Sequence, residues 1–98
     1  AWILRLESLN GYRYALRLTK AAEKELYGLQ LKQFRQVVRK IFSIQAEPRP
    51  QDCKELKGNP GIYRVDQGEY RILYTIEEDA VEIFRVGKRN DDEVYENL

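Results

Sequence analysis

The spacing of apolar residues along the chain predicts two helices that lead into a set of short strands. Between residues 32 and 42, apolar side chains recur at intervals of three and four, at Phe34, Val37, Val38, Ile41 and Phe42. This spacing is typical of one face of an amphipathic helix. The basic residues of the same segment fall on other faces, so the predicted helix has a basic outer surface.

A shorter helix is predicted just before it. Thr19 is a suitable N-cap for a helix that begins at Lys20, and Ala22 and Leu26 form a modest apolar stripe. Gly28 indicates that this helix is short.

Two prolines, Pro48 and Pro50, end the longer helix because proline lacks the backbone N–H that a helix needs. A loop is expected from there through Lys54, Lys57 and Gly58 to Pro60.

Segments rich in β-branched and aromatic residues predict four strands, at residues 12–18, 62–66, 70–76 and 81–86. Turn signals separate the last three strands, which predicts an antiparallel meander. Asn10-Gly11 favours a hairpin at the N-terminus, but the polar and apolar positions before it match the next strand poorly. Residues 1–11 are therefore assigned as an extension of uncertain structure.

The last eight residues, DDEVYENL, predict a short helix, because Asn90 and Glu93 have the spacing of a capping box. An N-terminal strand, a two-helix hairpin, a three-stranded meander and a short C-terminal helix make a compact single domain of the α+β class. We assign this domain to residues 12–98.

Composition narrows the chemistry of this domain. The 98 residues include 17 basic and 16 acidic side chains, so a polyanion can bind only where basic residues cluster. Histidine is absent and Cys53 is the single cysteine, which excludes an internal disulfide and standard histidine metal sites. No apolar run is long enough to span a membrane. We expect a cytoplasmic protein without a metal, a cofactor or a membrane partner.

The predicted meander gathers arginines at one end of the sheet. If Gln67 and Gly68 form a two-residue hairpin loop, Arg64 lies directly opposite Arg71. Like charges in this position destabilise an isolated sheet, so the pair calls for an anion. The same face can also simply be solvated.

The third strand of the meander extends this cluster. Pairing Ile76 with Val81 brings Tyr70 level with Gly87, so Lys88 and Arg89 follow at the same sheet end.

This pairing also predicts that Arg85 faces Ile72 on the apolar side. Either Arg85 then reaches the edge of the sheet, or a bulge shifts the register.

Tyr95 would return toward the arginines if the terminal helix forms. Guanidinium groups bind phosphate, and an aromatic ring stacks on an unpaired base, so this combination suits RNA. In the alternative, Tyr95 is a packing anchor between helix and sheet.

Two segments resemble the RelE family of bacterial toxins, within the wider RelE/ParE superfamily. They are LKGNPGIYRVDQGEYRILY, residues 56–74, and VGKRNDDEVY, residues 86–95. The resemblance covers about residues 12–98. It implies a toxin of a type II toxin-antitoxin system, an endoribonuclease that cleaves mRNA in the ribosomal A site. It also implies metal-free attack of a 2′-hydroxyl on the adjacent phosphate, and a RelB-like antitoxin as partner.

Carried over by position, the resemblance assigns catalytic roles to Arg64, Arg71, Arg89 and Tyr95. Asp66 departs from the family, because well-studied members have a lysine there that is proposed as the general base. Asp66 is then a base, a turn residue or a partner of the arginines.

Further basic residues are candidates for contacts with RNA, although ordinary solvated charges explain them equally well. These residues are Lys32, Arg35, Arg39, Lys40, Lys54, Lys57 and Lys88. Two rival functions stay open: a ParE-like inhibitor of DNA gyrase, and an inactive binding module with the toxin fold.

Overall fold

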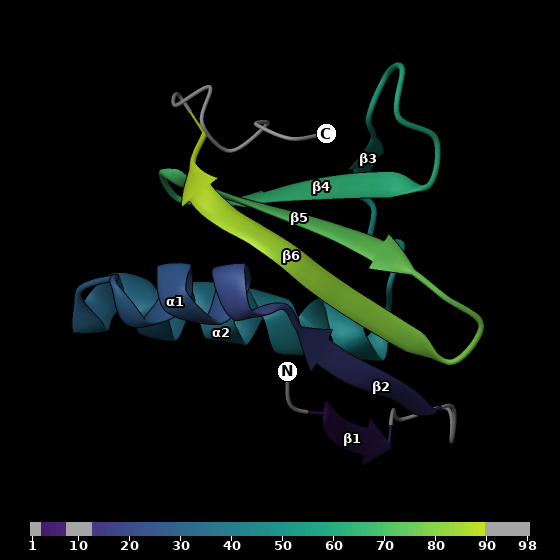
Figure 1. The fold of residues 1–98 in the computed structure, drawn as a ribbon, viewed down its shortest axis with the longest axis horizontal. Coiled ribbons are helices and arrows are strands. Elements are labelled where there is room, and N and C mark those ends of the chain that lie inside the picture. Colours follow the sequence, from purple (N-terminus) through teal and green to yellow (C-terminus); the bar gives the residue numbers. More distant parts are fainter. Residues whose placement is uncertain (1–2, 8–12, 90–98) are drawn as a thin grey trace.

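The computed structural model describes residues 3–7 and 13–89, and these form six strands and two helices (Figure 1). The elements in chain order are β1 (Ile3–Glu7), β2 (Arg13–Leu18), α1 (Lys20–Tyr27), α2 (Leu31–Ala46), β3 (Lys54–Glu55), β4 (Ile62–Gln67), β5 (Tyr70–Ile76) and β6 (Ala80–Lys88).

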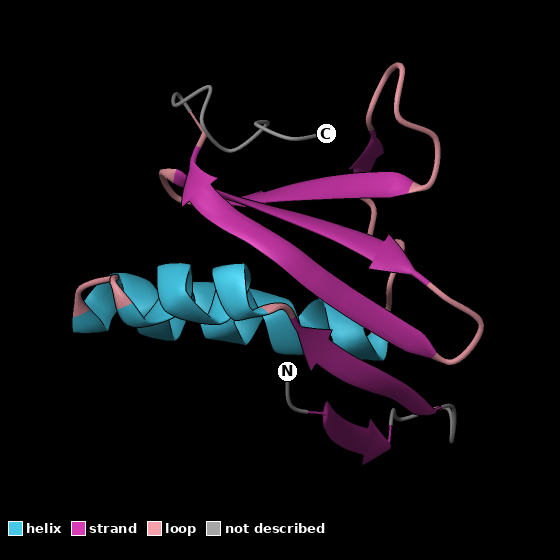
Figure 2. Ribbon diagram, in the orientation of Figure 1, coloured by secondary structure: helices cyan, strands magenta, loops and turns pink. Residues whose placement is uncertain are grey.

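All six strands belong to one sheet with the order β1-β2-β6-β5-β4-β3 (Figure 2). The predicted meander is confirmed, because β4, β5 and β6 pair in sequence and antiparallel. β2 joins them by pairing parallel to β6. The two helices lie together against the sheet, which confirms the α+β class.

Local sequence signals explain both helices. The Thr19 hydroxyl accepts a hydrogen bond of 3.2 Å from the Ala22 N–H, which confirms it as the N-cap of α1. Gly28 is the C-cap, so α1 is short as predicted. The longer helix α2 ends at Ala46, before the two prolines.

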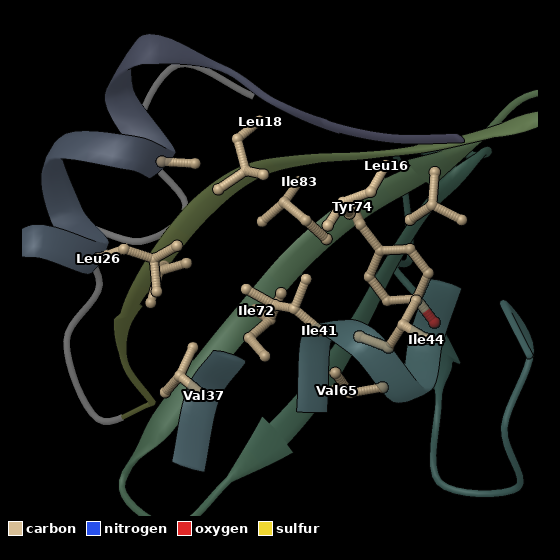
Figure 3. Close-up of a cluster of buried hydrophobic side chains, with 13 residues drawn as sticks. Leu16, Leu18, Leu26, Val37, Ile41, Ile44, Val65, Ile72, Tyr74 and Ile83 are labelled. Atoms are coloured by element: carbon tan, nitrogen blue, oxygen red, sulfur yellow. The ribbon is translucent and has the colours of Figure 1, made fainter. Parts of the chain in front are cut away.

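The core lies between the helices and one face of the sheet (Figure 3). Val37, Ile41 and Ile44 of α2 pack against Ile72 and Tyr74 of β5. The predicted apolar stripe of α2 therefore faces the sheet. Phe42, at the edge of that stripe, remains partly exposed.

The predicted turn of the β4–β5 hairpin is wrong by one residue, which shifts each cross-strand partner by two residues. Gln67 pairs with Tyr70, so the two loop residues are Gly68 and Glu69. Gly68 has a φ of 59°, which is the left-handed conformation that the first loop position of such hairpins requires. The shift places Asp66, rather than Arg64, opposite Arg71.

A register irregularity between β5 and β6 resolves the position of Arg85. Tyr74 pairs with Ile83 but Leu73 pairs with Arg85, so β6 contains one extra residue. Ile72 is thereby opposite Val86, and Arg85 does not face it. The bulge alternative is confirmed.

The same irregularity corrects a second pairing. Ile76 does pair with Val81, as predicted, but Tyr70 is level with Lys88 and not with Gly87.

Glu25 of α1 secures this bulge. One carboxylate oxygen accepts the Val86 N–H at 2.9 Å, and the other accepts Nε of Arg85 at 3.2 Å. A helix side chain thus satisfies a backbone donor next to the irregularity.

Two segments carry strands that the sequence does not predict. Ile3–Glu7 forms β1 and pairs with β2, with Glu7 opposite Arg13 and Leu4 opposite Leu16. This register differs by one residue from the one that an Asn10-Gly11 loop implies, and that loop lies outside the described residues. Lys54–Glu55, expected as loop, forms the short edge strand β3 beside β4. The predicted terminal helix and Tyr95 also lie outside the described residues.

Candidate functional site

The arginine cluster lies on the sheet face that points away from the helices. Successive residues of a strand point to opposite faces, and Ile72 packs in the helix-side core. Arg71 therefore projects from the other face. Asp66 is its cross-strand partner and shares that face.

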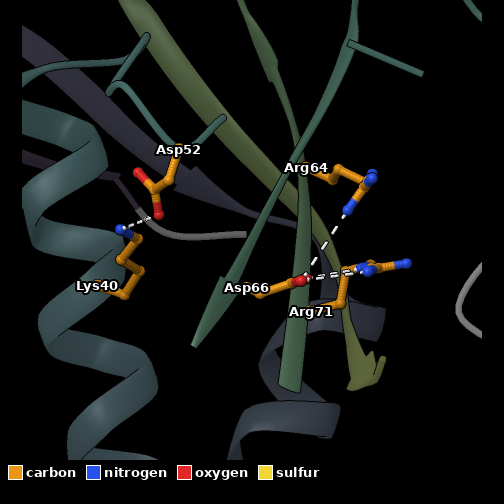
Figure 4. Close-up of polar contacts among 5 residues, drawn as sticks. All are labelled: Lys40, Asp52, Arg64, Asp66 and Arg71. Atoms are coloured by element: carbon orange, nitrogen blue, oxygen red, sulfur yellow. Dashed lines mark hydrogen bonds and ion pairs between the residues drawn. The ribbon is translucent and has the colours of Figure 1, made fainter. Parts of the chain in front are cut away.

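A bidentate ion pair joins the two side chains (Figure 4). Nε of Arg71 donates to Oδ1 of Asp66 at 2.7 Å, and Nη2 donates to Oδ2 at 3.2 Å. Nη1 of Arg64 lies 4.0 Å from the same Oδ2. The Arg71 side chain is only 16% exposed, so solvent screens this pair less than a typical surface pair.

The surrounding guanidinium groups determine the charge state of Asp66. Hydrogen bonding to Arg71 lowers the pKa of Asp66 below its ordinary value, and the charges of Arg71, Arg64 and Arg89 act in the same direction. Partial burial opposes them. Asp66 is therefore a carboxylate at neutral pH and a weak proton acceptor.

Arg89 lies just beyond the end of β6. Its backbone N–H donates to the carbonyl oxygen of Glu69 at 2.8 Å, which ties it to the β4–β5 turn. Because Arg89 also affects the pKa of Asp66, the structure brings together the three predicted arginines around one carboxylate. Lys88 is exposed at the same end of the sheet, but it lies opposite Tyr70 and so shares the other face of the sheet.

β3 adds a further basic residue to this face. Lys54 pairs with Arg64 across the strands, and directly opposite residues share a face. Lys57 follows in the exposed turn between β3 and β4. A basic surface therefore extends from the arginine cluster toward the β3 edge.

The basic residues of α2 form a separate group. Lys32 and Arg35 are exposed, as is Arg39, whereas Lys40 forms an ion pair of 2.7 Å with Asp52 (Figure 4). The helix α2 packs on one face of the sheet, and the arginine cluster lies on the other face. The outer surface of α2 therefore points away from the arginine cluster. The structure does not bring the two groups together.

Sequence reasoning missed an aromatic cluster at the other end of the sheet. The rings of Tyr63 and Tyr74 stack at 5.9 Å between centroids, and the Arg49 guanidinium lies 5.4 Å from the Tyr63 centroid. Burial is the main cause that raises the pKa of Tyr74. Its hydroxyl donates to the Pro48 carbonyl at 2.8 Å. No local sequence signal indicates these contacts.

An apolar cleft of about 220 Å³ opens between β2, α1 and α2. Exposed aromatic side chains, Tyr27 and Phe42, are part of its lining, and Leu31 is exposed nearby on α2. Exposed apolar patches of this kind mark surfaces for protein contacts.

The part of the chain that the structure describes holds no group of three or more His, Cys, Asp or Glu residues arranged to bind a metal ion. Within the same residues, no helix is long and apolar enough to cross a membrane.

A family model described as the ParE toxin of the type II toxin-antitoxin system parDE matches residues 16–93. The chain belongs to the RelE/ParE toxin family. It is thus a toxin of a type II toxin-antitoxin system. No curated protein sequence matches it significantly.

Solved structures of RelE toxins support the same family. The toxin-antitoxin complex RelBE2 from Mycobacterium tuberculosis includes a chain with 31% identity and a TM-score of 0.69; the match covers 78% of this chain and 98% of that one. The isolated E. coli RelE toxin has 30% identity and a TM-score of 0.67, over 82% and 88% of the two chains. The intact E. coli RelBE complex has 28% identity and a TM-score of 0.65, over 74% and 93%.

Proposed function

We propose that this RelE/ParE toxin is a ribosome-dependent endoribonuclease that cleaves mRNA in the A site and so inhibits translation. The observation that carries the proposal is that Arg64 and Arg71 share one sheet face around Asp66, while Arg89 follows β6 close enough for its charge to lower the pKa of Asp66. Similarity to solved RelE toxins supports it.

In the proposed reaction, the 2′-hydroxyl of one nucleotide attacks the adjacent phosphorus. The bond to the 5′-oxygen of the next nucleotide breaks, which leaves a 2′,3′-cyclic phosphate and a free 5′-hydroxyl. Arg71 holds the scissile phosphate and stabilises the negative charge of the pentacovalent transition state. Guanidinium groups supply this charge, so the reaction needs no metal ion.

The other residues of the proposed site have supporting roles. Arg89 binds the phosphate or protonates the leaving oxygen, Tyr95 stacks on a base beside the cut, and Arg64 adds positive charge. Lys54, Lys57 and Lys88 extend the RNA contact, and the basic face of α2 contacts ribosomal RNA. The low pKa of Asp66 disfavours it as the general base.

A RelB-like antitoxin is the proposed protein partner, since the M. tuberculosis and E. coli relatives were solved in complexes with antitoxins. The apolar cleft beside Tyr27 and Phe42 suits apolar side chains of such a partner. Phe42→Ser should weaken antitoxin binding in a pull-down with the antitoxin encoded beside the toxin. Unchanged binding would exclude this cleft from the interface.

Primer extension on translated messages, after expression in bacteria, tests the nuclease. Wild type should give cuts in phase with codons, and Arg71→Ala should reduce the rate on the order of 10²-fold. Arg89→Ala and Tyr95→Phe should also reduce it. Lys24→Ala is the matched control, because Lys24 is exposed on α1, away from the sheet face.

A ParE-like inhibitor of DNA gyrase is the second candidate, because the matching family model describes ParE. The same cells distinguish the two functions. Altered plasmid supercoiling without codon-phased cuts would overturn the nuclease and favour gyrase. Asp66→Asn in a single-turnover ribosome assay tests the base: an undiminished rate excludes Asp66 as the proton acceptor.

A further inference from the structure

The carboxylate of Asp66 sits where an incoming phosphate would be expected to bind. Asp66 is the cross-strand partner of Arg71 and takes its Nε and Nη2 at 2.7 and 3.2 Å. This is the fork geometry in which guanidinium binds either a carboxylate or a phosphate through two parallel hydrogen bonds. One edge of Arg71 is thus engaged by an internal anion.

The charges around Asp66 favour this arrangement in the absence of RNA. Arg64 lies 4.0 Å from the same carboxylate, and Lys54 is opposite Arg64 on the neighbouring strand. The Asp66 carboxylate therefore neutralises part of this positive charge and reduces the repulsion among the basic side chains. Its side chain is 32% exposed, so it can swing into solvent without unfolding the strand.

We propose that Asp66 is a built-in competitor of the RNA phosphate, which occupies the Nε and Nη2 edge of Arg71 until a phosphodiester displaces it. This inference rests on the proposed function, since it assumes that the arginine face binds RNA. Because the phosphodiester must first displace the Asp66 carboxylate from Arg71, the protein binds RNA that is free in solution more weakly. A ribosome that holds the message beside the site supplies a high effective concentration and overcomes the competition.

The size of the effect follows from Coulomb's law. A unit negative charge about 5 to 6 Å from a bound phosphate weakens binding about tenfold, between the limits for water and for a partly buried pair. Asp66→Asn removes that charge and keeps the shape of the side chain. It should therefore bind RNA about tenfold more tightly at low ionic strength.

Fluorescence anisotropy with a labelled single-stranded RNA hexanucleotide measures this affinity. Its riboses carry 2′-O-methyl groups, so cleavage cannot occur. Asp66→Asn should bind about tenfold more tightly than wild type, whereas Asp66→Glu, which retains the charge, should bind as wild type does. Adding Arg71→Ala to Asp66→Asn should abolish the gain, because the competition acts through Arg71.

Glu77→Gln is the matched control for net charge. It also converts a carboxylate to an amide, at an ion pair of 3.4 Å with Arg17, beyond the end of β5 that is remote from Arg71. Its affinity should stay at the wild-type value.

Four results would each overturn the inference: an unchanged or weaker affinity of Asp66→Asn, a gain that persists without Arg71, an equal gain in Glu77→Gln, or no RNA binding by any variant. Failure of codon-phased cleavage would instead refute the nuclease, because this binding assay involves no cleavage.

Discussion

The buried hydroxyl of Tyr74 is predicted to make a measurable contribution to the free energy of unfolding. Tyr74 is fully buried, and its hydroxyl donates a hydrogen bond of 2.8 Å to the carbonyl oxygen of Pro48, which is also a buried residue. Tyr74→Phe keeps the ring and its packing but deprives that carbonyl of this donor. The expected loss is about 1 to 3 kcal/mol in the free energy of unfolding.

Tyr63 provides a matched control in the same ring stack. Its hydroxyl accepts a long hydrogen bond of 3.4 Å from Nη2 of Arg49 at the surface. Water replaces that donor when the hydroxyl is removed. Tyr63→Phe should therefore change stability by less than about 0.5 kcal/mol.

Urea unfolding followed by circular dichroism compares the two variants. Tyr74→Phe should lower the midpoint without changing the m-value, since the packed surface is the same. Its melting temperature should fall by about 4 to 8 °C for each kcal/mol lost. If the two variants lose equal stability, burial of the Pro48 carbonyl has no energetic consequence and the reasoning is refuted.

Three further predictions concern single contacts. Thr19→Ala removes the N-cap of α1 and should cost about 0.5 to 2 kcal/mol in urea unfolding; no loss would show that the cap is redundant. Glu25→Gln weakens the bonds to Arg85 and to the Val86 N–H, and should cost about 1 to 2 kcal/mol by the same assay. Because the pKa of Asp66 is lowered in the folded state, its stabilisation is present above the unfolded-state pKa of about 3.9 and is lost as the pH falls through the folded-state value. Asp66→Asn should therefore flatten the acid limb of a stability–pH curve, and an unaltered limb would contradict the assignment.

The helices were predictable because their signals are local. Thr19 caps α1 through a residue three positions away, and the stripe of α2 repeats within a few turns. Pro48 lies just after the end of α2. The start of α1, the apolar stripe of α2 and the end of α2 are thus each determined by residues that are close in the sequence.

The hairpin register was not predictable from the same kind of pattern. Val65 has an apolar partner in both registers, Tyr70 in the predicted one and Ile72 in the observed one. The apolar pattern therefore does not distinguish them. The backbone of Gly68 does, because its left-handed φ fits the first loop position.

The bulge in β6 depends on a contact that is distant in sequence. Glu25 precedes Val86 by 61 residues, and its carboxylate accepts the Val86 N–H. The parallel pairing of β2 with β6 is equally non-local. The bulge and the parallel strand pairing therefore cannot be inferred from the residue pattern along the chain, because both depend on tertiary contacts.

The two-residue shift of partners in the hairpin changes the chemistry inferred for the site. In the predicted register, Arg71 faces Arg64, and two like charges call for an external anion. In the observed register, Arg71 faces Asp66, and the protein provides the anion itself. The sequence identifies the residues of the candidate site, but it does not show which of them lies opposite Arg71. Under the proposed function, an RNA phosphate competes with Asp66 for this arginine, so the departure at Asp66 bears on binding even though Asp66 is a poor base.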